Sequence, residues 1–150
     1  MPGTYSSILL HVVCSTRRRD PSITPQIRGR LLPFMGGIVR DQGGVLMSIN
    51  AVENHFHGLI RWRTDGTVAD LMRHLKSRSS RWVHQTFPGS PQFAWQEGYS
   101  VFTVSASQKP VVERYIARQQ EHHRRFRFEA ELITLLKRHE VQYDPERVFD

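Results

Sequence analysis

The fold is decided by the stretch "GGVLMSINAVENHFHGLIRWR", residues 43–63. Residues 43–52 and 55–63 are two runs rich in apolar and β-branched side chains, and the polar pair Glu53-Asn54 separates them. Two such runs joined by a short polar connection are typical of a β-hairpin. The sequence therefore predicts an antiparallel hairpin in the middle of the chain.

Helix and strand patterns continue on both sides of this hairpin. Thr24, which precedes Pro25, and Thr67 are each expected to start a helix, because a threonine hydroxyl accepts a hydrogen bond from the first turn. Ser107 is expected to start a third helix in the same way. In chain order we expect strands at residues 5–16, 43–52, 55–63 and 99–106, and helices at residues 24–42, 68–85, 108–123 and 126–139.

The order of these elements predicts the fold class. The first six follow the sequence β-α-β-β-α-β of the ferredoxin-like split βαβ fold, an antiparallel sheet with helices on one face. Two extra C-terminal helices follow them. A length of 150 residues suits one domain, so we expect an α+β domain spanning residues 1–150.

Composition narrows the function classes. Hydrophobic residues make up 39% and charged residues 23%, as in globular proteins. No apolar run approaches the roughly 18–20 residues that span a bilayer, and the charges near the start follow the apolar stretch, the reverse of a secretory signal. Cys14 is the single cysteine, which excludes an intramolecular disulfide framework and a Cys-rich zinc site. We expect a cytoplasmic protein without a membrane partner.

The charge balance favours a polyanionic partner. Lysine and arginine number 21 against 14 acidic residues, giving a net charge of +7 with neutral histidines. Only Lys76, Lys109 and Lys137 are lysines, and guanidinium groups clamp phosphate oxygens bidentately. An arginine-rich small domain favours a nucleic-acid-binding function, although the charge alone fits a soluble basic protein equally well.

The two histidines of the hairpin are candidate metal ligands. Side chains alternate across a strand, so His55 and His57 project from one face and Phe56 from the other. Two imidazoles about 7 Å apart along a strand can bind one ion together. Two ligands do not make a site, however, and an H-x-H pattern by itself is more often a pair of ordinary strand residues that bind no metal.

A third ligand can come from two sources. One is another histidine, as in three-histidine zinc sites. The other is the helix after the last strand, where Tyr115 and Gln119 are four residues apart and share one helical face. If that helix packs over the hairpin, Gln119 completes the ligand set and Tyr115 lies beside the metal. The remaining histidines are His11, His74, His84, His122, His123 and His139.

These residues resemble a known family. "ENHFHGLI" is similar to the HUH motif (His, bulky hydrophobic, His) of single-tyrosine HUH transposases, the small insertion-sequence and REP-associated tyrosine transposases. "YIARQQ" resembles the family's tyrosine helix, with a glutamine one turn after the tyrosine. "LLHVVCSTRRR", "LMRHLKSRSSRWV" and "FAWQEGYSVFTVS" resemble the first strand, the basic helix and the last strand, in the family's order.

The resemblance implies a fold, a reaction and a set of roles. The fold is the ferredoxin-like sheet that the element order also predicts. The reaction is cleavage and rejoining of single-stranded DNA at hairpin-bearing ends, through a 5′-phosphotyrosine intermediate on Tyr115. Carried over by position, His55, His57 and Gln119 hold a divalent cation, Mg²⁺ or Mn²⁺. The family also implies a homodimer, with the tyrosine acting in cis or in trans.

Basic and aromatic residues then become candidates for DNA contact. Trp82, Trp95 or Phe102 could stack on unpaired bases, although such aromatic residues more often belong to the core. The arginines that follow the tyrosine helix, Arg124, Arg125 and Arg127, add to this basic surface. The residues expected to neutralise phosphates are Arg73, Lys76, Arg78 and Arg81 on one helix, and Arg17, Arg18 and Arg19 after the first strand.

Two other functions stay open. A non-catalytic or domesticated nucleic-acid-binding protein would use the same sheet and aromatics without chemistry. A metal-dependent hydrolase would use His55, His57 and another histidine, with Glu53 as the nearest candidate base. Only the transposase hypothesis requires a covalent protein–DNA intermediate.

Overall fold

A computed structural model of the chain describes residues 3–149. Its strands are β1 (Leu9–Ser15), β2 (Val45–Val52), β3 (His55–Arg61) and β4 (Ser100–Val104), and its helices are α1 (Pro25–Asp41), α2 (Val68–Thr86), α3 (Lys109–Ala117), α4 (Gln119–His122) and α5 (Phe128–Arg138). Two short 3₁₀ turns, Arg17–Arg19 and Ala106–Gln108, follow β1 and β4.

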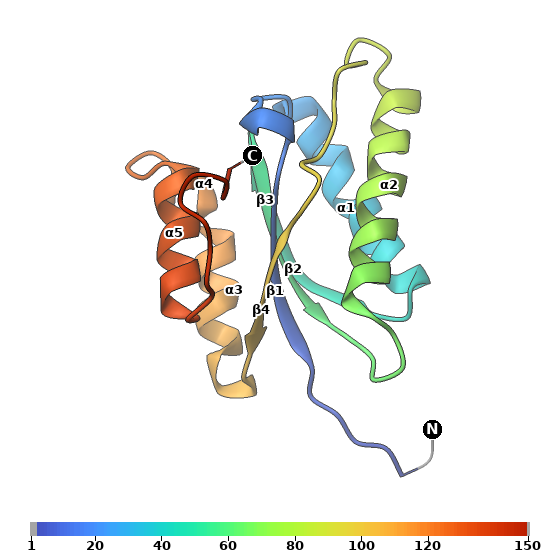
Figure 1. Ribbon diagram of the computed structural model, residues 1–150. Coiled ribbons are helices and arrows are strands. Elements are labelled where there is room, and N and C mark those ends of the chain that lie inside the picture. Colours follow the sequence, from blue (N-terminus) through green and yellow to red (C-terminus); the bar gives the residue numbers. More distant parts are fainter. Residues whose placement is uncertain (1–2, 150) are drawn as a thin grey trace.

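The four strands form one sheet in the order β2-β3-β1-β4, and every neighbouring pair is antiparallel (Figure 1). Strand β3 lies between β1 and β2, which is the split βαβ arrangement. The predicted hairpin is present, with Val52 opposite His55 across the Glu53-Asn54 turn. The expected α+β fold class is therefore confirmed.

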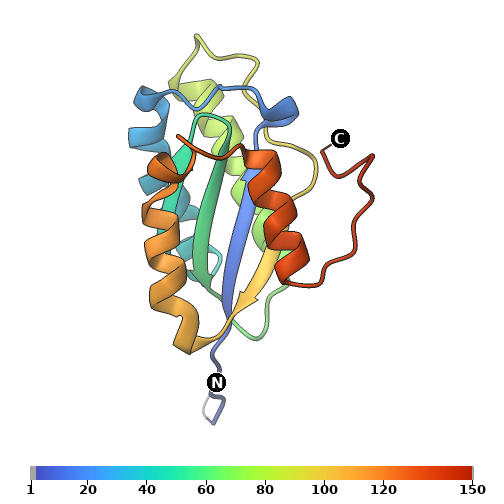
Figure 2. The same ribbon diagram turned by 90° about the vertical axis from the view of Figure 1, so that its left-hand side faces the viewer.

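Helices cover both faces of the sheet. α1 and α2 lie together on one face, whereas α3, α4 and α5 lie on the other (Figure 1). Figure 2 looks onto the second face and shows α3 and α5 on either side of it, with β3 and β1 visible between them. The extra C-terminal helices thus form a third layer, so the central strands β1 and β3 are buried from both sides.

Alternation along the strands gives the two faces different surfaces. Leu10, Val12 and Cys14 of β1 point into the apolar core beneath α1 and α2, and Phe56 and Ile60 of β3 join them. The residues between them point toward α3, α4 and α5. Buried partners from α1 and α2 include Ile27, Leu31, Met35, Leu71, Met72 and Leu75.

The first two helix starts are as predicted. Thr24 Oγ1 accepts from the Ile27 amide at 3.2 Å, and Thr67 Oγ1 accepts from the Asp70 amide at 3.0 Å. Ser107 is not a cap, because it lies inside the 3₁₀ turn and its hydroxyl bonds to that of Ser105. That prediction was wrong.

Several element boundaries also differ from expectation. The first strand begins at Leu9 rather than at residue 5, and the last helix begins at Phe128 rather than at residue 126. The expected helix over residues 108–123 is broken at Arg118, whose φ of −100° and ψ of 19° end α3 before α4 resumes at Gln119. Within residues 3–149, no helix is both long and apolar enough to cross a membrane.

Candidate active site

His55 and His57 lie on β3 with both imidazoles fully buried, and they face the layer of α3, α4 and α5. Phe56 between them points the other way and packs edge-on against Trp95, with ring centroids 5.2 Å apart. The shared face predicted for the two histidines is thus present. Their burial excludes the reading that either is an exposed decoration of the strand.

Both imidazoles are held in defined orientations by their Nδ1 atoms. His55 Nδ1–H donates to Asn54 Oδ1 at 2.8 Å, and His57 Nδ1 is hydrogen-bonded to His11 Nε2 at 2.8 Å. Burial lowers the pKa of His11 to about 3, so it is neutral near pH 7. The Asn54 oxygen can only accept, so it fixes the proton of neutral His55 on Nδ1 and leaves Nε2 free for a metal ion, whereas His11 orients the ring of His57.

The free Nε2 atoms converge on a residue that the sequence patterns did not identify, Glu131 of α5. Glu131 Oε1 lies 2.9 Å from His57 Nε2 and 3.3 Å from His55 Nε2. The same oxygen lies 3.2 Å from His123 Nε2. Glu131 is 4% exposed, so one buried carboxylate sits at the centre of three imidazoles.

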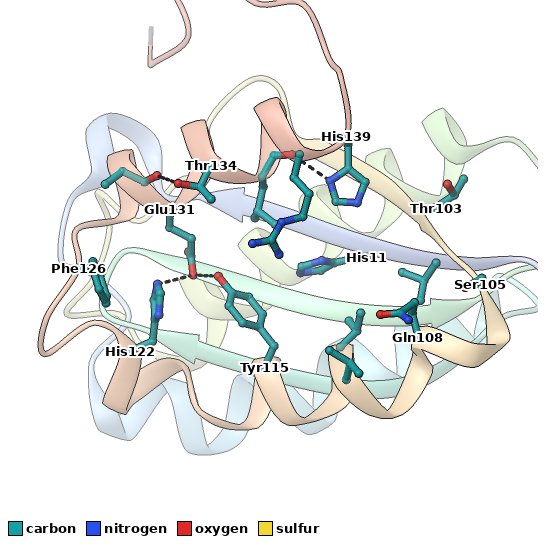
Figure 3. A pocket seen from close by; sticks show the side chains of 16 residues that line it. His11, Thr103, Ser105, Gln108, Tyr115, His122, Phe126, Glu131, Thr134 and His139 are labelled. Carbon is teal, nitrogen blue, oxygen red and sulfur yellow. Dashed lines mark hydrogen bonds and ion pairs between the residues drawn. The ribbon is translucent and has the colours of Figure 1, made fainter.

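Tyr115 and Gln119 reach the same point from α3 and α4. The Tyr115 hydroxyl donates to Glu131 Oε2, as Figure 3 shows, and Gln119 Nε2 donates to that oxygen at 3.1 Å. Gln119 Oε1 faces His55 Nε2 at 3.3 Å and His123 Nε2 at 2.9 Å. The two residues therefore meet at the histidines as expected, although the helix is interrupted between them.

The remaining histidines divide into two groups. His122 Nε2 lies 3.3 Å from Glu131 Oε2, and His139 lines the cavity beside Tyr115. His84 instead bonds the Phe93 carbonyl, and His74 lies on α2 beyond the sheet. Of the six alternative histidine ligands considered from the sequence, His123 is the one in ligand position.

His55, His57, His123 and Glu131 form a buried cluster, and the pKa values of several groups in and beside it are shifted. Burial pushes the pKa of Glu131 upward, but hydrogen bonds from His123, His55 and His57 outweigh it and hold that pKa well below its ordinary value. Burial lowers the pKa of His55 to about 4. Burial, followed by the negative charge of Glu131, raises the pKa of Tyr115. Burial lowers the pKa of His123, but its hydrogen bond with Glu131 outweighs burial and raises that pKa above the ordinary value. The site thus holds an ionised carboxylate beside a protonated phenol.

This donor set fits a divalent cation. One ligand atom from each of His55, His57, His123 and Glu131 can be chosen so that all four lie within 4.8 Å of one another. Imidazole nitrogens and a carboxylate oxygen suit Zn²⁺, Mn²⁺ and related ions. The carboxamide oxygen of Gln119 lies close enough to His55 and His123 to belong to the same set.

Two hollows flank the cluster. A cavity of about 570 Å³ opens on Tyr115, His122 and Glu131 and is walled by β4, α3 and α5 (Figure 3). On the other side, a groove of about 940 Å³ runs past His123. Its arginines are Arg18, Arg19, Arg28, Arg124, Arg125 and Arg127. The histidines therefore lie between a cavity and an arginine-rich groove.

The basic residues predicted to contact DNA fall in two places. Arg17, Arg18 and Arg19 form the 3₁₀ turn after β1, and the last two line the groove beside the cluster. The group on α2 lies on the opposite face of the sheet (Figure 1). There, Arg73 pairs with Asp70, Arg78 pairs with Asp41, Lys76 donates to the Glu97 and Gly98 carbonyls, and Arg81 is exposed.

The expected base-stacking aromatics are not available for that role. Trp95 is 8% exposed and Phe102 is 4% exposed, because both belong to apolar cores. Trp82 is half-buried and stacks on Phe34 with ring centroids 4.8 Å apart. For Trp95 and Phe102 the more common core role is therefore confirmed, because protein covers their rings.

A sequence signal for Glu131 exists. Phe128, Leu132, Leu135 and Leu136 mark the apolar stripe of α5, and Glu131 falls on the same stripe, three residues after Phe128. A carboxylate on a buried helical face requires a polar partner. Glu53, the carboxylate considered from the sequence, is instead exposed in the hairpin turn.

Comparison with known proteins gives the family. A family model described as "Transposase IS200 like" matches residues 4–119, which is more than three quarters of the chain. The chain belongs to this transposase family. The matched region contains His55, His57, Tyr115 and Gln119, whereas His123 and Glu131 lie beyond its end.

Individual relatives of this transposase are distant. The ISDra2 transposase TnpA of Deinococcus radiodurans is 18% identical over 124 residues, which cover 79% of this chain and 89% of that protein. A solved structure of a candidate transposase from Deinococcus radiodurans matches with a TM-score of 0.66 at 22% identity, covering 79% of this chain and 95% of the other. A REP-associated tyrosine transposase, solved bound to a REP hairpin, matches with a TM-score of 0.59 at 16% identity, covering 82% and 73%. These structural likenesses support the same fold.

Proposed function

We propose that this transposase cleaves and rejoins single-stranded DNA by transesterification, with Tyr115 as the nucleophile. One observation carries the proposal: the Tyr115 hydroxyl, the Nε2 atoms of His55 and His57 and the Gln119 carboxamide converge on one buried point between a cavity and an arginine-rich groove. A nucleophile beside preoriented cation ligands is the arrangement that phosphoryl transfer needs.

In the proposed reaction, the Tyr115 oxygen bonds to the scissile phosphorus while the bond from phosphorus to the 3′ oxygen breaks. The phenol loses its proton, the departing oxygen gains one as a free 3′-OH, and the phosphate stays on Tyr115 as a 5′-phosphotyrosine. Rejoining is the reverse attack by a 3′-OH, so the phosphodiester bond is conserved without ATP. Hairpin-bearing DNA ends are the proposed substrate.

His55, His57 and Gln119 would hold the divalent cation, for which we propose Mg²⁺ or Mn²⁺. When bound, the cation polarises a phosphate oxygen and stabilises negative charge that develops on it. The protein residues orient the reactants: Asn54 and His11 fix the imidazoles, and Glu131 fixes the phenol through its hydrogen bond. Because its pKa is well below the ordinary value, Glu131 is a weak base, and its role toward Tyr115 is positioning.

The path of DNA follows from charge. Arg124, Arg125 and Arg127 line the groove together with Arg18 and Arg19, so a strand whose phosphates follow this groove passes the metal ligands. Tyr115 faces its own chain's His57 with ring centroids 5.6 Å apart, which supports action in cis. We propose a homodimer on the resemblance to the family, with each protomer carrying a whole site.

The test is an adduct assay. Protein, Mn²⁺ and labelled hairpin oligonucleotides taken from the DNA that flanks the gene are incubated, and a denaturation-resistant protein–DNA adduct is sought. We expect an adduct with the wild type and with Tyr5→Phe, an exposed control, and none with Tyr115→Phe.

Other outcomes of this assay would support one of the alternative functions. Cut DNA without any adduct indicates a hydrolase that uses water. Binding without cutting on every flanking substrate indicates a non-catalytic DNA-binding protein. An adduct that survives Tyr115→Phe would place the nucleophile elsewhere.

A further inference from the structure

The C-terminal helices bring two potential ligands to the histidine pair that the family match does not include. His123 follows α4, and Glu131 lies on α5, whereas the match ends at residue 119. We propose that His123 and Glu131 join His55 and His57 in binding one divalent transition-metal ion, so that the C-terminal helices complete the metal site. This inference rests on the proposed function, because it extends the same site.

Geometry is the first argument. Glu131 Oε1 lies 2.9, 3.3 and 3.2 Å from the Nε2 atoms of His57, His55 and His123. Ligands about 2.0–2.2 Å from a single ion lie roughly 3–4 Å from one another. The three distances from Glu131 match this spacing, and all four donor atoms lie within 4.8 Å of one another, close to the arrangement of a ligand set.

Charge is the second argument. The Glu131 side chain is 2% exposed, and its polar partners are four imidazoles, the Gln119 amide and the Tyr115 phenol. None of these groups carries a fixed positive charge. A buried carboxylate without a fixed cation is costly, and a divalent ion at the centre of the imidazoles supplies that charge.

The placement of Glu131 does not depend on the carboxylate alone. Phe128, one turn earlier on α5, packs against His55 with ring centroids 4.3 Å apart. Leu132, Leu135 and Leu136 join Val13 and Phe102 in an apolar cluster on the sheet. Arg19 Nε pairs with Glu129 Oε1 at 3.0 Å. These contacts dock α5 and hold the Glu131 side chain over the histidines.

The ligand types set the metal preference. Mg²⁺ favours oxygen ligands and retains several waters, whereas imidazole nitrogens favour Mn²⁺, Co²⁺ and Zn²⁺. A set of three imidazoles and one carboxylate therefore selects a transition metal over Mg²⁺. As a consequence, the ion should bind to the protein in the absence of DNA and stay bound, instead of arriving together with the substrate.

The test measures metal binding without DNA. The full chain is freed of metal with a chelator and titrated with Mn²⁺, followed by the loss of the free-ion electron paramagnetic resonance signal, and with Co²⁺, followed by its visible absorption. Replacing groups that only support a metal ligand costs 10–100-fold in affinity, so we expect Glu131→Gln, which removes a direct ligand, to weaken binding by at least about 100-fold.

His123→Gln tests the second new ligand independently of α5, and we expect it to weaken binding by at least about tenfold. Both variants should also show a smaller metal-induced rise in Tm than the wild type, and the reduction should be larger for Glu131→Gln. Glu121→Gln, an exposed carboxylate on α4, and His74→Gln, on α2, are matched controls that should bind as the wild type does.

Two results overturn the proposal. Unchanged affinity in Glu131→Gln and His123→Gln means that the ion needs only the family residues. Tighter binding in Glu131→Gln means that the carboxylate competes with the ion for the imidazoles. Circular dichroism of each metal-free variant shows whether it is folded, and if Glu131→Gln is not, His123→Gln decides the question.

The adduct assay on the same preparations separates this inference from the proposed function. An adduct without any dependence of metal affinity on His123 or Glu131 refutes the four-ligand site alone. Tight metal binding that depends on Glu131, with no adduct on any flanking substrate, refutes the transesterification proposal alone.

Discussion

The two faces of the central sheet have opposite chemistry although they are built from alternate residues of the same strands. Toward α1 and α2, β1 and β3 present Val12, Cys14, Phe56 and Ile60, all in an apolar core. Toward α3, α4 and α5, β1 presents His11, and β3 presents His55 and His57. The Glu131 carboxylate contacts both of these β3 histidines. One face is an apolar core, whereas the other combines apolar clusters around α3 and α5 with a group of buried ionisable side chains.

The difference separates stability from chemistry. Apolar burial is favourable for each side chain, so the α1/α2 face stabilises the sheet without a ligand. Buried polar groups contribute little net free energy and are costly when they lose a partner. The position of the histidines is therefore fixed by the packing behind them, and the four predictions below test that division.

The largest expected effect on stability is at Phe56. Phe56→Ala removes a fully buried ring that packs against Trp95 and should lower the free energy of unfolding by about 3–5 kcal/mol. Urea denaturation measures it. Phe126→Ala, at a side chain that is 54% exposed, is the control and should cost less than about 0.5 kcal/mol. Equal losses at the two positions would contradict the assignment of the core.

The next effect is on chemistry at the neighbouring position. His57→Gln removes a proposed metal ligand, so adduct formation should fall by at least about 100-fold. The free energy of unfolding of the metal-free protein should change less than in Phe56→Ala. The assignment would be contradicted if His57→Gln lost as much stability as Phe56→Ala while its folded fraction still formed the adduct. The histidine face would then serve stability and not chemistry.

A smaller effect follows from Cys14, on the apolar face. Burial raises the pKa of its thiol to about 12 from an ordinary value of 9.0. Between these values the unfolded state loses the proton that the folded state keeps, so the stability contributed below pH 9 is lost as pH rises. The loss should be about 1.4 kcal/mol for each pH unit above 9. Urea unfolding of wild type and Cys14→Ala from pH 8 to 10.5 measures the difference, and parallel profiles would show that the thiol ionises equally in both states.

The smallest expected effect is on the salt dependence of DNA binding, and it distinguishes the arginines of the groove from those of α2. If DNA follows the groove, Arg124→Ala and Arg125→Ala should each reduce the slope of log K against log salt by about 0.7 for a single strand. Arg73→Ala and Arg81→Ala on α2 should leave the slope unchanged. Fluorescence anisotropy with a labelled oligonucleotide at several salt concentrations measures it. A smaller slope in the α2 variants alone would move the DNA path to the α1/α2 side.

Local patterns were enough for most of the fold. The hairpin, the starts of α1 and α2 and the alternation that places His55 opposite Phe56 depend on contacts within a few residues, and all are present. The expected helix over residues 108–123 failed at Arg118, because a break in backbone conformation has no strong signature in "YIARQQEHH". The sequence left two roles open for Trp95 and Phe102, because a strand or loop aromatic looks the same whether protein or DNA covers it.

The sequence by itself determined the order of the elements, the face of the histidines and the spacing of Tyr115 and Gln119, since strand and helix periods are local properties. Only the tertiary structure decided that Glu131 lies among the imidazoles, that His123 rather than another histidine joins them, and that the α2 cations lie on the far face. The first of these facts depends on how α5 docks over β3, where His57 meets Glu131 from 74 residues away in the chain. Docking is set by the sum of many weak apolar contacts, so no short stretch of the chain encodes it.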